Sequence, residues 1–281
     1  MSRPNKAADK AGPRHWQTIW QESTLPRLVT PSDSSVRNHV RRCLHGFFSR
    51  AINGRRGLKL IEVGCANSVW LPYFAEEHGC LVSGVDSSRL GCESARKLLT
   101  LAGVSGDILE ADLWDIPEAL IGSFDVVFTY GFVEHFEPVD GVLVAASDLL
   151  KPGGLIVTIV PNLSGLNGLL QKYLNRSVFD IHVAMDLDDL DAAHKKADLE
   201  VSWSGYLCSI NFGVINPAEI SDGFLTRAAK SVFVNALIGL SALVWWLEDH
   251  HVLRVRPNRL TSPYIACMAT KGKDIARQSS E

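Results

Sequence analysis

Apolar positions along this chain form short runs that alternate with amphipathic stretches between residues 58 and 160. A run of four to eight apolar residues bounded by glycine or an acid indicates a buried strand, and apolar spacing of three and four indicates a helix. A Lys-Pro-Gly-Gly sequence at 151–154 is expected to stop the last helix. The pattern predicts strands at 58–63, 81–85, 107–110, 124–129 and 155–160, with helices at 69–78, 88–102 and 139–150.

Outside this region the pattern is looser and predicts an N-terminal helical cap and a late insertion. We expect helices at 15–22, 36–51 and 186–197, strands at 201–206 and 264–270, and no structure before Trp16. The expected organisation is a single domain over 14–271 between a disordered tail (1–13) and a second tail (272–281). Its parts are a cap (14–55), a core (56–206), a helical insertion (209–263) and a last strand (264–270).

Alternating strands and helices predict an α/β fold with a doubly wound, mostly parallel sheet and helices on both faces. Ligands of such sheets bind outside the carboxyl ends of the strands, near the point where the strand order reverses. Gly64, Asp86 and Asp112 each follow a predicted strand, and so does the stretch 130–135. These residues are therefore expected to meet at one edge of the sheet.

Composition sets limits on the function. The 281 residues carry a net charge of −3 and are 46% hydrophobic, which is ordinary for a globular protein and disfavours a broad nucleic-acid surface. The polar N-terminal stretch lacks the apolar core of a secretory signal, so we expect a cytoplasmic location. Six cysteines without a C-x-x-C pair predict reduced thiols rather than a zinc site.

Asp86 is a candidate ligand for a ribose. It ends the second predicted strand, 22 residues after Gly64, and a carboxylate there can accept hydrogen bonds from both ribose hydroxyls. The alternative is a cap for the helix that begins near Ser88.

Five stretches of the sequence resemble motifs of class I S-adenosylmethionine-dependent methyltransferases, a Rossmann-like family. The resemblance covers 56–206 and 263–271, and is nearest to small-molecule members such as ubiquinone O-methyltransferases. It departs from the family pattern at Ala66 and Ser68, where glycine is usual. The matching stretches are Glu62-Val63-Gly64-Cys65-Ala66-Asn67-Ser68, Val82-Ser83-Gly84-Val85-Asp86-Ser87-Ser88, Ala111-Asp112-Leu113, Phe124-Asp125-Val126-Val127 with Val133-Glu134-His135, and Leu149-Leu150-Lys151-Pro152-Gly153-Gly154.

The resemblance implies S-adenosyl-L-methionine as the cofactor. Glu62 is expected to order the first loop, Asp112 to meet the adenine amino group, and Tyr130 to lie near the amino-acid end of the cofactor. The implied cofactor-binding residues are Glu62, Gly64, Cys65, Ala66, Asp86, Ser87, Asp112, Leu113 and Tyr130.

Two other functions remain open on the same fold. A nicotinamide-dependent dehydrogenase requires glycine at 64, 66 and 69, but the chain has Gly64, Ala66 and Val69, which disfavours this class. A non-catalytic binding module is the second alternative, since Ala66 and Ser68 would crowd the loop and a fold does not determine a function.

Two histidines are candidates for a general base. His135 follows the fourth predicted strand, and His182 lies in the segment after the fifth, which covers acceptor pockets in the resembling family. Either could instead be structural. Some relatives carry Glu-x-x-Glu-His at this point and bind a divalent metal; here Gly131 replaces the first acid, so we predict no metal.

We expect a small-molecule acceptor, most simply a hydroxyl, because the chain lacks a basic tract suited to nucleic acid; N- and C-methylation stay open. Segment 231–247 has no charged residue and is at the short limit for a membrane span. It is interpreted as a helix packed on the domain or on a second subunit of a homodimer, as a lid over an apolar acceptor, or as a peripheral membrane contact.

Overall fold

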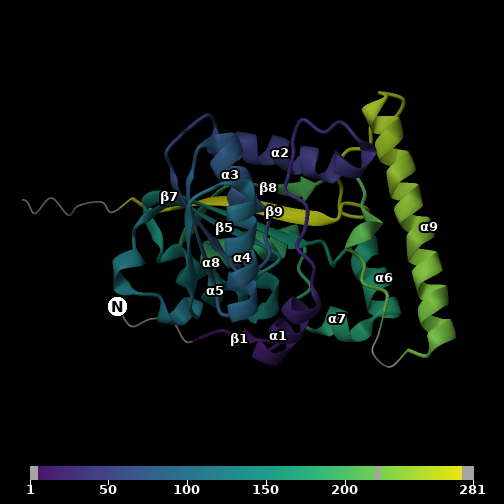
Figure 1. Cartoon of the computed structure of the whole chain (residues 1–281), viewed down its shortest axis with the longest axis horizontal. Helices are drawn as coiled ribbons and strands as arrows, with labels where there is room; N and C mark the ends of the chain where they lie inside the picture. The colour runs from purple at the N-terminus through teal and green to yellow at the C-terminus, as the bar shows by residue number, and fades with distance from the viewer. Residues whose placement is uncertain (1–5, 219–221, 274–281) are drawn as a thin grey trace, which may run out of the picture.

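A seven-stranded sheet forms the centre of the molecule (Figure 1). The structure is a computed structural model that describes residues 6–218 and 222–273. In spatial order the strands are β4 (Gly106–Glu110), β3 (Leu81–Asp86), β2 (Lys59–Val63), β5 (Phe124–Tyr130), β7 (Leu150–Pro161), β9 (Tyr264–Lys271) and β8 (Leu199–Leu207).

The first five strands pair in parallel, and β9 runs antiparallel to both of its neighbours. The predicted α/β fold with a mostly parallel sheet is therefore confirmed. The order reverses at β2, which has β3 on one side and β5 on the other. This reversal creates a crevice at the carboxyl ends of the two central strands.

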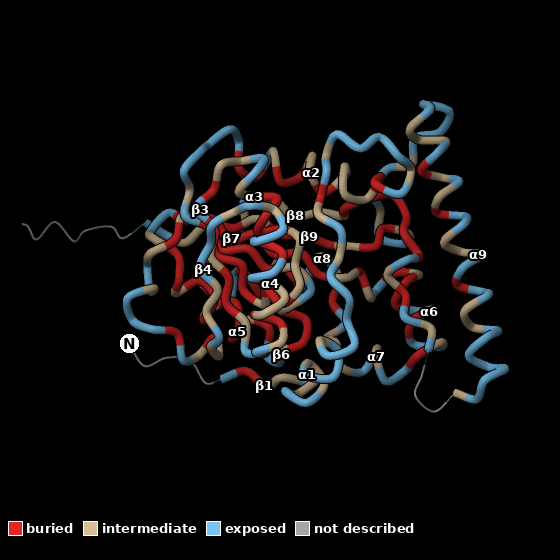
Figure 2. The backbone as a smooth tube through the Cα atoms, viewed as in Figure 1, coloured by how far each residue is buried: buried red, intermediate tan, exposed pale blue. Residues whose placement is uncertain are grey.

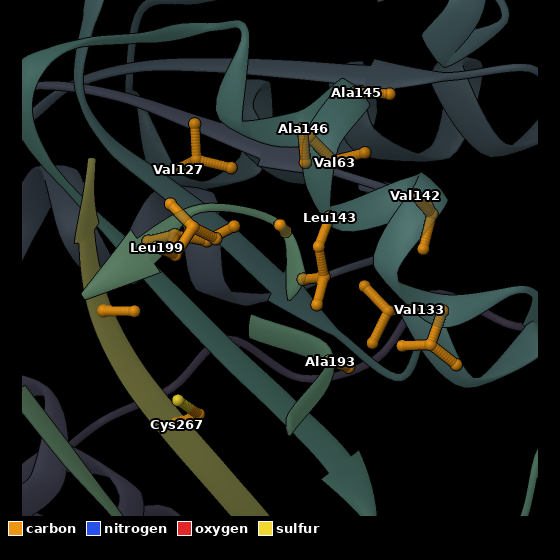
Figure 3. Close-up of a cluster of buried hydrophobic side chains, with 14 of the residues drawn as sticks. Val63, Val127, Val133, Val142, Leu143, Ala145, Ala146, Ala193, Leu199 and Cys267 are labelled. Atoms are coloured by element: carbon orange, nitrogen blue, oxygen red, sulfur yellow. The ribbon is translucent and has the colours of Figure 1, made fainter. Parts of the chain in front are cut away.

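Helices cover both faces of the sheet because successive residues of each strand point to opposite sides. Leu60 and Val126 pack toward α2 (His39–Ile52), α3 (Trp70–His78) and α4 (Arg89–Ala102). Their neighbours Ile61 and Val127 pack toward α5 (Val139–Ser147) and α8 (Leu187–Lys196), in the cluster shown in Figure 3. The buried positions of both layers gather at the centre of the molecule (Figure 2).

Local signals fix several helix ends. Gly79 and Gly103 end α3 and α4 in the left-handed conformation that glycine adopts without strain. Ser88 begins α4 by accepting a hydrogen bond from the Gly91 N–H, and Asp186 begins α8 through a capping box with Asp189.

The helix predicted at 139–150 ends earlier than the periodicity indicates. α5 ends at Ser147, and Leu150 already belongs to β7. The carbonyls of Asp148 and Leu149 accept hydrogen bonds from the chain entering β5, so the following residues are drawn into the sheet instead of continuing the helix.

The N-terminal segment differs from the tail that its composition favoured. Residues 1–5 lie outside the described residues, but β1 (Ala8–Asp9) pairs with β6 (Phe136–Glu137), and α1 (Pro13–Glu22) follows directly. The Lys10 N–H donates to the His135 carbonyl, 2.9 Å away. This segment is therefore held against the carboxyl edge of the sheet.

The insertion contains a long helix, α9 (Phe224–Asp249), which stands beside the sheet layers and not within them (Figure 1). It packs near α6 (Leu166–Leu174), with the short α7 (Arg176–Asp180) following α6. The short 3₁₀ helices are Val36–Asn38, Leu113–Asp115, Glu118–Leu120, Val133–His135 and Phe212–Val214.

One side of α9 packs on the domain and another faces outward. Val234, Ser241 and Trp245 are the buried residues of α9, and Leu237 and Val244 also pack against this cluster. On the outward side, Val232 and Leu243 are 70% and 53% exposed. The interpretation of segment 231–247 as a helix packed on the domain agrees with these contacts, and the second-subunit and lipid interpretations of its outward side stay predictions.

Replacing Leu143 by alanine tests the core described here. Its side chain is fully buried (Figure 3), so the vacated space should lower the free energy of unfolding by about 2–5 kcal/mol. Leu101→Ala on α4 is the matched control, since that side chain is 65% exposed and its loss should change stability by at most about 0.5 kcal/mol. Urea denaturation followed by circular dichroism measures both. Equal effects would contradict this placement of the core.

Candidate active site

The carboxyl ends of the central strands surround one cavity of about 290 Å³. Its position outside β2 and β5 is the crevice that the strand order creates. Residues from distant parts of the sequence thus meet around one space. The predicted site residues that line it are Gly64, Asp86, Ser87, Asp112, Leu113 and His135.

The loop after β2 approaches the cavity through its backbone. Gly64 has a φ of +77°, and a Cβ on it would lie 2.3 Å from the Phe132 ring, so only glycine fits. Cys65 and Ala66 are buried and do not line the cavity. Their side chains therefore do not contact a ligand in it directly, although the sequence analysis included them among the cofactor-binding residues. Their contribution to a ligand is limited to the backbone of the loop.

Asp86 offers acceptor capacity at the cavity wall. Its two carboxylate oxygens accept hydrogen bonds from the N–H groups of Ala66 (3.1 Å) and Ser88 (2.7 Å). Desolvation raises the pKa of this carboxyl, and the two backbone hydrogen bonds oppose the rise. A carboxylate has about four acceptor positions, so each oxygen keeps a free position that suits the hydroxyls of a ribose.

Asp112 holds a short 3₁₀ helix and the N-terminal segment at the same time. One oxygen accepts a hydrogen bond from the Trp114 N–H at 3.0 Å, and the other forms an ion pair with Lys6. The Lys6 ammonium also lies 5.6 Å from the centroid of the Trp114 ring. The carboxylate that the resemblance assigns to adenine is therefore already in contact with the N-terminal segment.

Glu62 and Tyr130 do not line the cavity. Glu62 is 1% exposed; burial raises the pKa of this carboxyl well above its usual value, and the nearby Ser68 hydroxyl opposes the rise. The proximity to Ser68 supports a role in ordering the loop. The Tyr130 ring packs against Trp70 and Tyr264, and the next residue, Gly131, lines the cavity instead.

His135 lines the cavity and His182 lies behind it, with 4.4 Å between their ring centroids. His135 Nδ1 donates to the Ile181 carbonyl at 3.1 Å, and His182 Nδ1 donates to the Val178 carbonyl at 2.6 Å. Each Nε2 therefore keeps its lone pair. Burial lowers the pKa of His135 to about 3 and lowers that of His182, so both rings are neutral at pH 7.

A buried acid completes this group. Glu134 is 1% exposed, neither of its carboxylate oxygens has a hydrogen-bond partner, and burial raises its pKa to about 8. One ligand atom each from Glu134, His135 and His182 lie within 4.8 Å of one another. One carboxylate with two imidazoles is a set that can hold a divalent metal.

The sequence motif could not reveal this group, because His182 joins it from a segment beyond β7. Our prediction of no metal rests on the missing acid at Gly131 and is not tested by the geometry, so it stays a prediction.

Several lining residues escaped the sequence analysis. The Trp16 ring meets the His135 ring edge-on at 4.7 Å, and Trp20 stacks on Trp16. The four-residue spacing of the two tryptophans on an expected helix was the one signal for an aromatic surface. The other lining residues that were missed are Lys6, Asp9, Pro13, Trp114, Phe132 and Phe136.

The residues present fit an adenosyl group. A backbone cradle at Gly64, acceptor positions on Asp86 and an aromatic wall are what a ribose and a flat base require.

Comparison with known proteins identifies a matching domain. Residues 61–158 match the family model described as a methyltransferase domain. The chain is 31% identical over 121 residues to a ubiquinone biosynthesis O-methyltransferase of Vibrio atlanticus, covering 43% of this chain and 48% of the relative. The chain thus spans about half the length of that relative.

Solved structures share the fold at low identity. A phosphoethanolamine N-methyltransferase of Haemonchus contortus in complex with S-adenosyl-L-methionine has a TM-score of 0.54 at 18% identity, covering 83% of this chain and 53% of its own. The [4+2]-cyclase SpnF has a TM-score of 0.53 at 15% identity, covering 82% and 81%. The confirmed sheet, the matched domain and the relative support a class I S-adenosylmethionine-dependent methyltransferase domain over residues 61–158, a type of domain whose cofactor is S-adenosyl-L-methionine.

Proposed function

We propose that this protein transfers the methyl group of S-adenosylmethionine to a hydroxyl of a small molecule. The observation that carries the proposal is the convergence of Gly64, Asp86 and Asp112 on one cavity that also contains a neutral histidine. The O-methyltransferase name of the Vibrio relative supports a hydroxyl acceptor over an amine or a carbon. A cytoplasmic location is part of the proposal.

The chain's own residues bind, orient and exclude water. Asp86 and Asp112 would hold the adenosyl group, and Gly64 lets the backbone approach it. When bound, the cofactor supplies an electrophilic methyl group. Trp16 covers the cavity beside His135, and holding an acceptor in line within such a shielded space provides much of the acceleration of a displacement.

His135 is the proposed proton acceptor because it lines the cavity and its Nε2 keeps its lone pair. With a pKa of about 3 it is a weak base by itself. Glu134 Oε1 lies 3.9 Å from this nitrogen. Because burial raises the Glu134 pKa to about 8, only its ionised fraction can stabilise the imidazolium that forms. His182 does not line the cavity, so it would act by positioning His135.

The alternative of a non-catalytic binding module is weakened by how the unusual loop residues pack. The Ala66 methyl lies next to Gly91, where an added Cβ would be only 3.1 Å away, and the Ser68 hydroxyl accepts a hydrogen bond from the Trp70 N–H at 3.1 Å. Neither residue lines the cavity. N- and C-methylation on the same site remain the alternatives to be tested with acceptors.

We further propose that α9 makes a peripheral contact with a lipid surface. In the described chain it is the one helix long and apolar enough to cross a membrane, and 17% of its most apolar window is buried. Trp245 Nε1 bonds the Ile210 carbonyl at 2.8 Å, which favours a helix held on the domain over a spanning one. Its outward side carries Leu240 and Leu243 without a charged residue between 231 and 247.

Asp86→Asn tests cofactor binding. The neutral amide weakens the charged hydrogen bonds to the ribose, so the dissociation constant for S-adenosylhomocysteine should rise about 10- to 150-fold, or about 1.5–3 kcal/mol. Isothermal titration calorimetry measures it. Asp107→Asn is the control, because this acid is exposed on β4 and does not line the cavity. Unchanged affinity in a folded Asp86 variant would remove Asp86 from the site.

His135→Asn tests the proton acceptor. We expect the turnover number to fall about 100-fold, with a smaller loss for His182→Asn. Release of S-adenosylhomocysteine in the presence of a panel of phenols and aliphatic alcohols measures turnover. His78→Asn, which removes a ring hydrogen-bonded to Tyr73 away from the cavity, is the control.

The pH profile adds a second readout for His135. Because its folded pKa is lowered to about 3, the base form persists at all higher pH values and is lost only as the pH falls through about 3. Turnover should therefore show no histidine inflection between pH 6 and 7. An inflection there that disappears in His135→Asn would contradict the neutral, buried ring.

The pair Leu240→Glu and Leu243→Glu tests the lipid contact. Two charges on the outward side of α9 should weaken binding to anionic phospholipid vesicles about tenfold or more, because apolar area is no longer buried on binding. Co-sedimentation with vesicles measures it, and Leu101→Glu on exposed α4 is the control. Wild-type protein that stays in the supernatant would contradict the proposal. A dimer lost in the double variant would assign this side of α9 to a second copy.

A further inference from the structure

A second cavity, of about 930 Å³, lies where α2, the end of β8 and the C-terminal end of α9 meet (Figure 1). It shares no lining residue with the cofactor cavity. Its walls carry an unusual set of reactive and titratable groups that the proposed methyl transfer does not use. They are His39, Cys43, Cys208, Glu248 and Asp249.

Cys43, His39 and Asp249 form a relay. His39 and Cys43 lie one turn apart on α2, with 3.5 Å between His39 Nε2 and Cys43 Sγ. The other ring nitrogen of His39 is 3.1 Å from Asp249 Oδ1, and Arg42 fixes the second oxygen of Asp249 at 2.6 Å. Glu248 Oε2 lies 3.4 Å from His39 Nε2. The two acids stabilise a positive charge on the imidazole, which in turn stabilises a thiolate on Cys43.

The charges of this relay agree with that arrangement. Burial opposes protonation of His39, yet its contacts with Cys43 and Asp249 raise its pKa above the usual value. The pKa of the Cys43 thiol is lowered, chiefly by a hydrogen bond from Cys208 and further by His39. Burial instead raises the pKa of Cys92 to about 11. Cys43 is also the one cysteine of the chain that is not buried.

Cys208 is fixed beside Cys43. It follows β8 with a φ of +61°, a conformation that non-glycine residues rarely adopt. Its carbonyl accepts a hydrogen bond from the Ser262 hydroxyl at 2.7 Å, which ties the residue in place. Its thiol is buried, and the residue lines the same cavity as Cys43. A second sulfur therefore shares a cavity with the Cys43 thiolate, and the two thiols influence each other's pKa.

We propose that Cys43 and Cys208 are an oxidant-sensitive thiol pair, in which Cys43 reacts with a hydroperoxide and Cys208 resolves the product into a disulfide. The Cys43 thiolate attacks the terminal peroxide oxygen, the O–O bond breaks, and the departing oxygen takes a proton from the His39 imidazolium. This gives a sulfenic acid and, from hydrogen peroxide, one water. The Cys208 sulfur then displaces hydroxide from the sulfenic sulfur, and its proton leaves with that hydroxide as a second water. Peroxide is reduced and the two thiols are oxidised, so the step is independent of methyl transfer.

Peptide mapping of the reduced, full-length protein after hydrogen peroxide treatment at pH 6.5 tests the proposal. We expect a disulfide-linked pair of peptides carrying Cys43 and Cys208, which dithiothreitol reverses. Before oxidation, iodoacetamide should label Cys43 at pH 6.5 about tenfold faster than a thiol of the denatured chain. A lowered pKa increases the fraction of thiolate and decreases the nucleophilicity of each thiolate, and the first effect on the alkylation rate is the larger one. A link between other cysteines, no link, or labelling at the denatured rate would overturn the proposal.

Variants separate the three roles. Cys208→Ser should stop the reaction at a Cys43 sulfenic acid that dimedone traps, and Cys43→Ser should give neither product. His39→Gln should slow oxidation of Cys43 about tenfold and move the pH midpoint of its alkylation upward. His45→Gln is the matched control, since this histidine lies on the same helix but bonds Tyr73. Equal rates in the two histidine variants would remove His39 from the relay. The wild-type measurement stands even where a variant fails to fold.

Discussion

The close approach of the loop after β2 to the end of β5 is the constraint on which the site depends. Parallel pairing puts the carboxyl ends of β2, β3 and β5 at one edge of the sheet. Because the strand order reverses at β2, the loops that follow the central strands diverge and leave a crevice between them. Gly64 then faces the Phe132 ring at a distance that leaves no room for a Cβ. With any larger residue the loop would move away from Phe132, and the backbone cradle and the acids that flank it would no longer bound one cavity.

The loop tolerates its departures from the family pattern because neighbouring residues compensate. Ala66 is accommodated by Gly91, and the Cys65 sulfur occupies the space that a Cβ on Gly84 would need, at 2.7 Å. The Ser68 hydroxyl favours the charged form of the buried Glu62 and so opposes the effect of burial on its pKa. The loop therefore departs from the family pattern at Ala66 and Ser68, but its packing against the neighbouring residues is preserved.

The sequence predicted the elements whose burial follows a simple period, and missed what depends on long-range contacts. The strands from β2 to β5 and the helix ends at Gly79 and Ser88 follow from local patterning. The placement of residues 6–13 against the sheet could not be predicted, because it depends on Lys6 meeting Asp112, 106 residues away. For the same reason the motif at Glu134 gave no sign of His182. Periodicity shows that the helix over 231–247 has an apolar side, but not what each side meets, so the sequence left its packing partner open.

The N-terminal segment and the cofactor share a group, and this links them energetically. Asp112 is bonded at one oxygen by the Trp114 N–H and at the other by Lys6, while Trp16 of the same segment covers His135. A ligand that binds Asp112 changes the free energy of the ion pair between Asp112 and Lys6. Because coupling between two sites is reciprocal, docking of the N-terminal segment changes the affinity for that ligand by the same free energy. An exposed ion pair is worth at most about 1 kcal/mol, so the coupling carried by Lys6 alone is small. The β1–β6 pairing and the Lys10 hydrogen bond hold the rest of the segment against the sheet independently of Asp112.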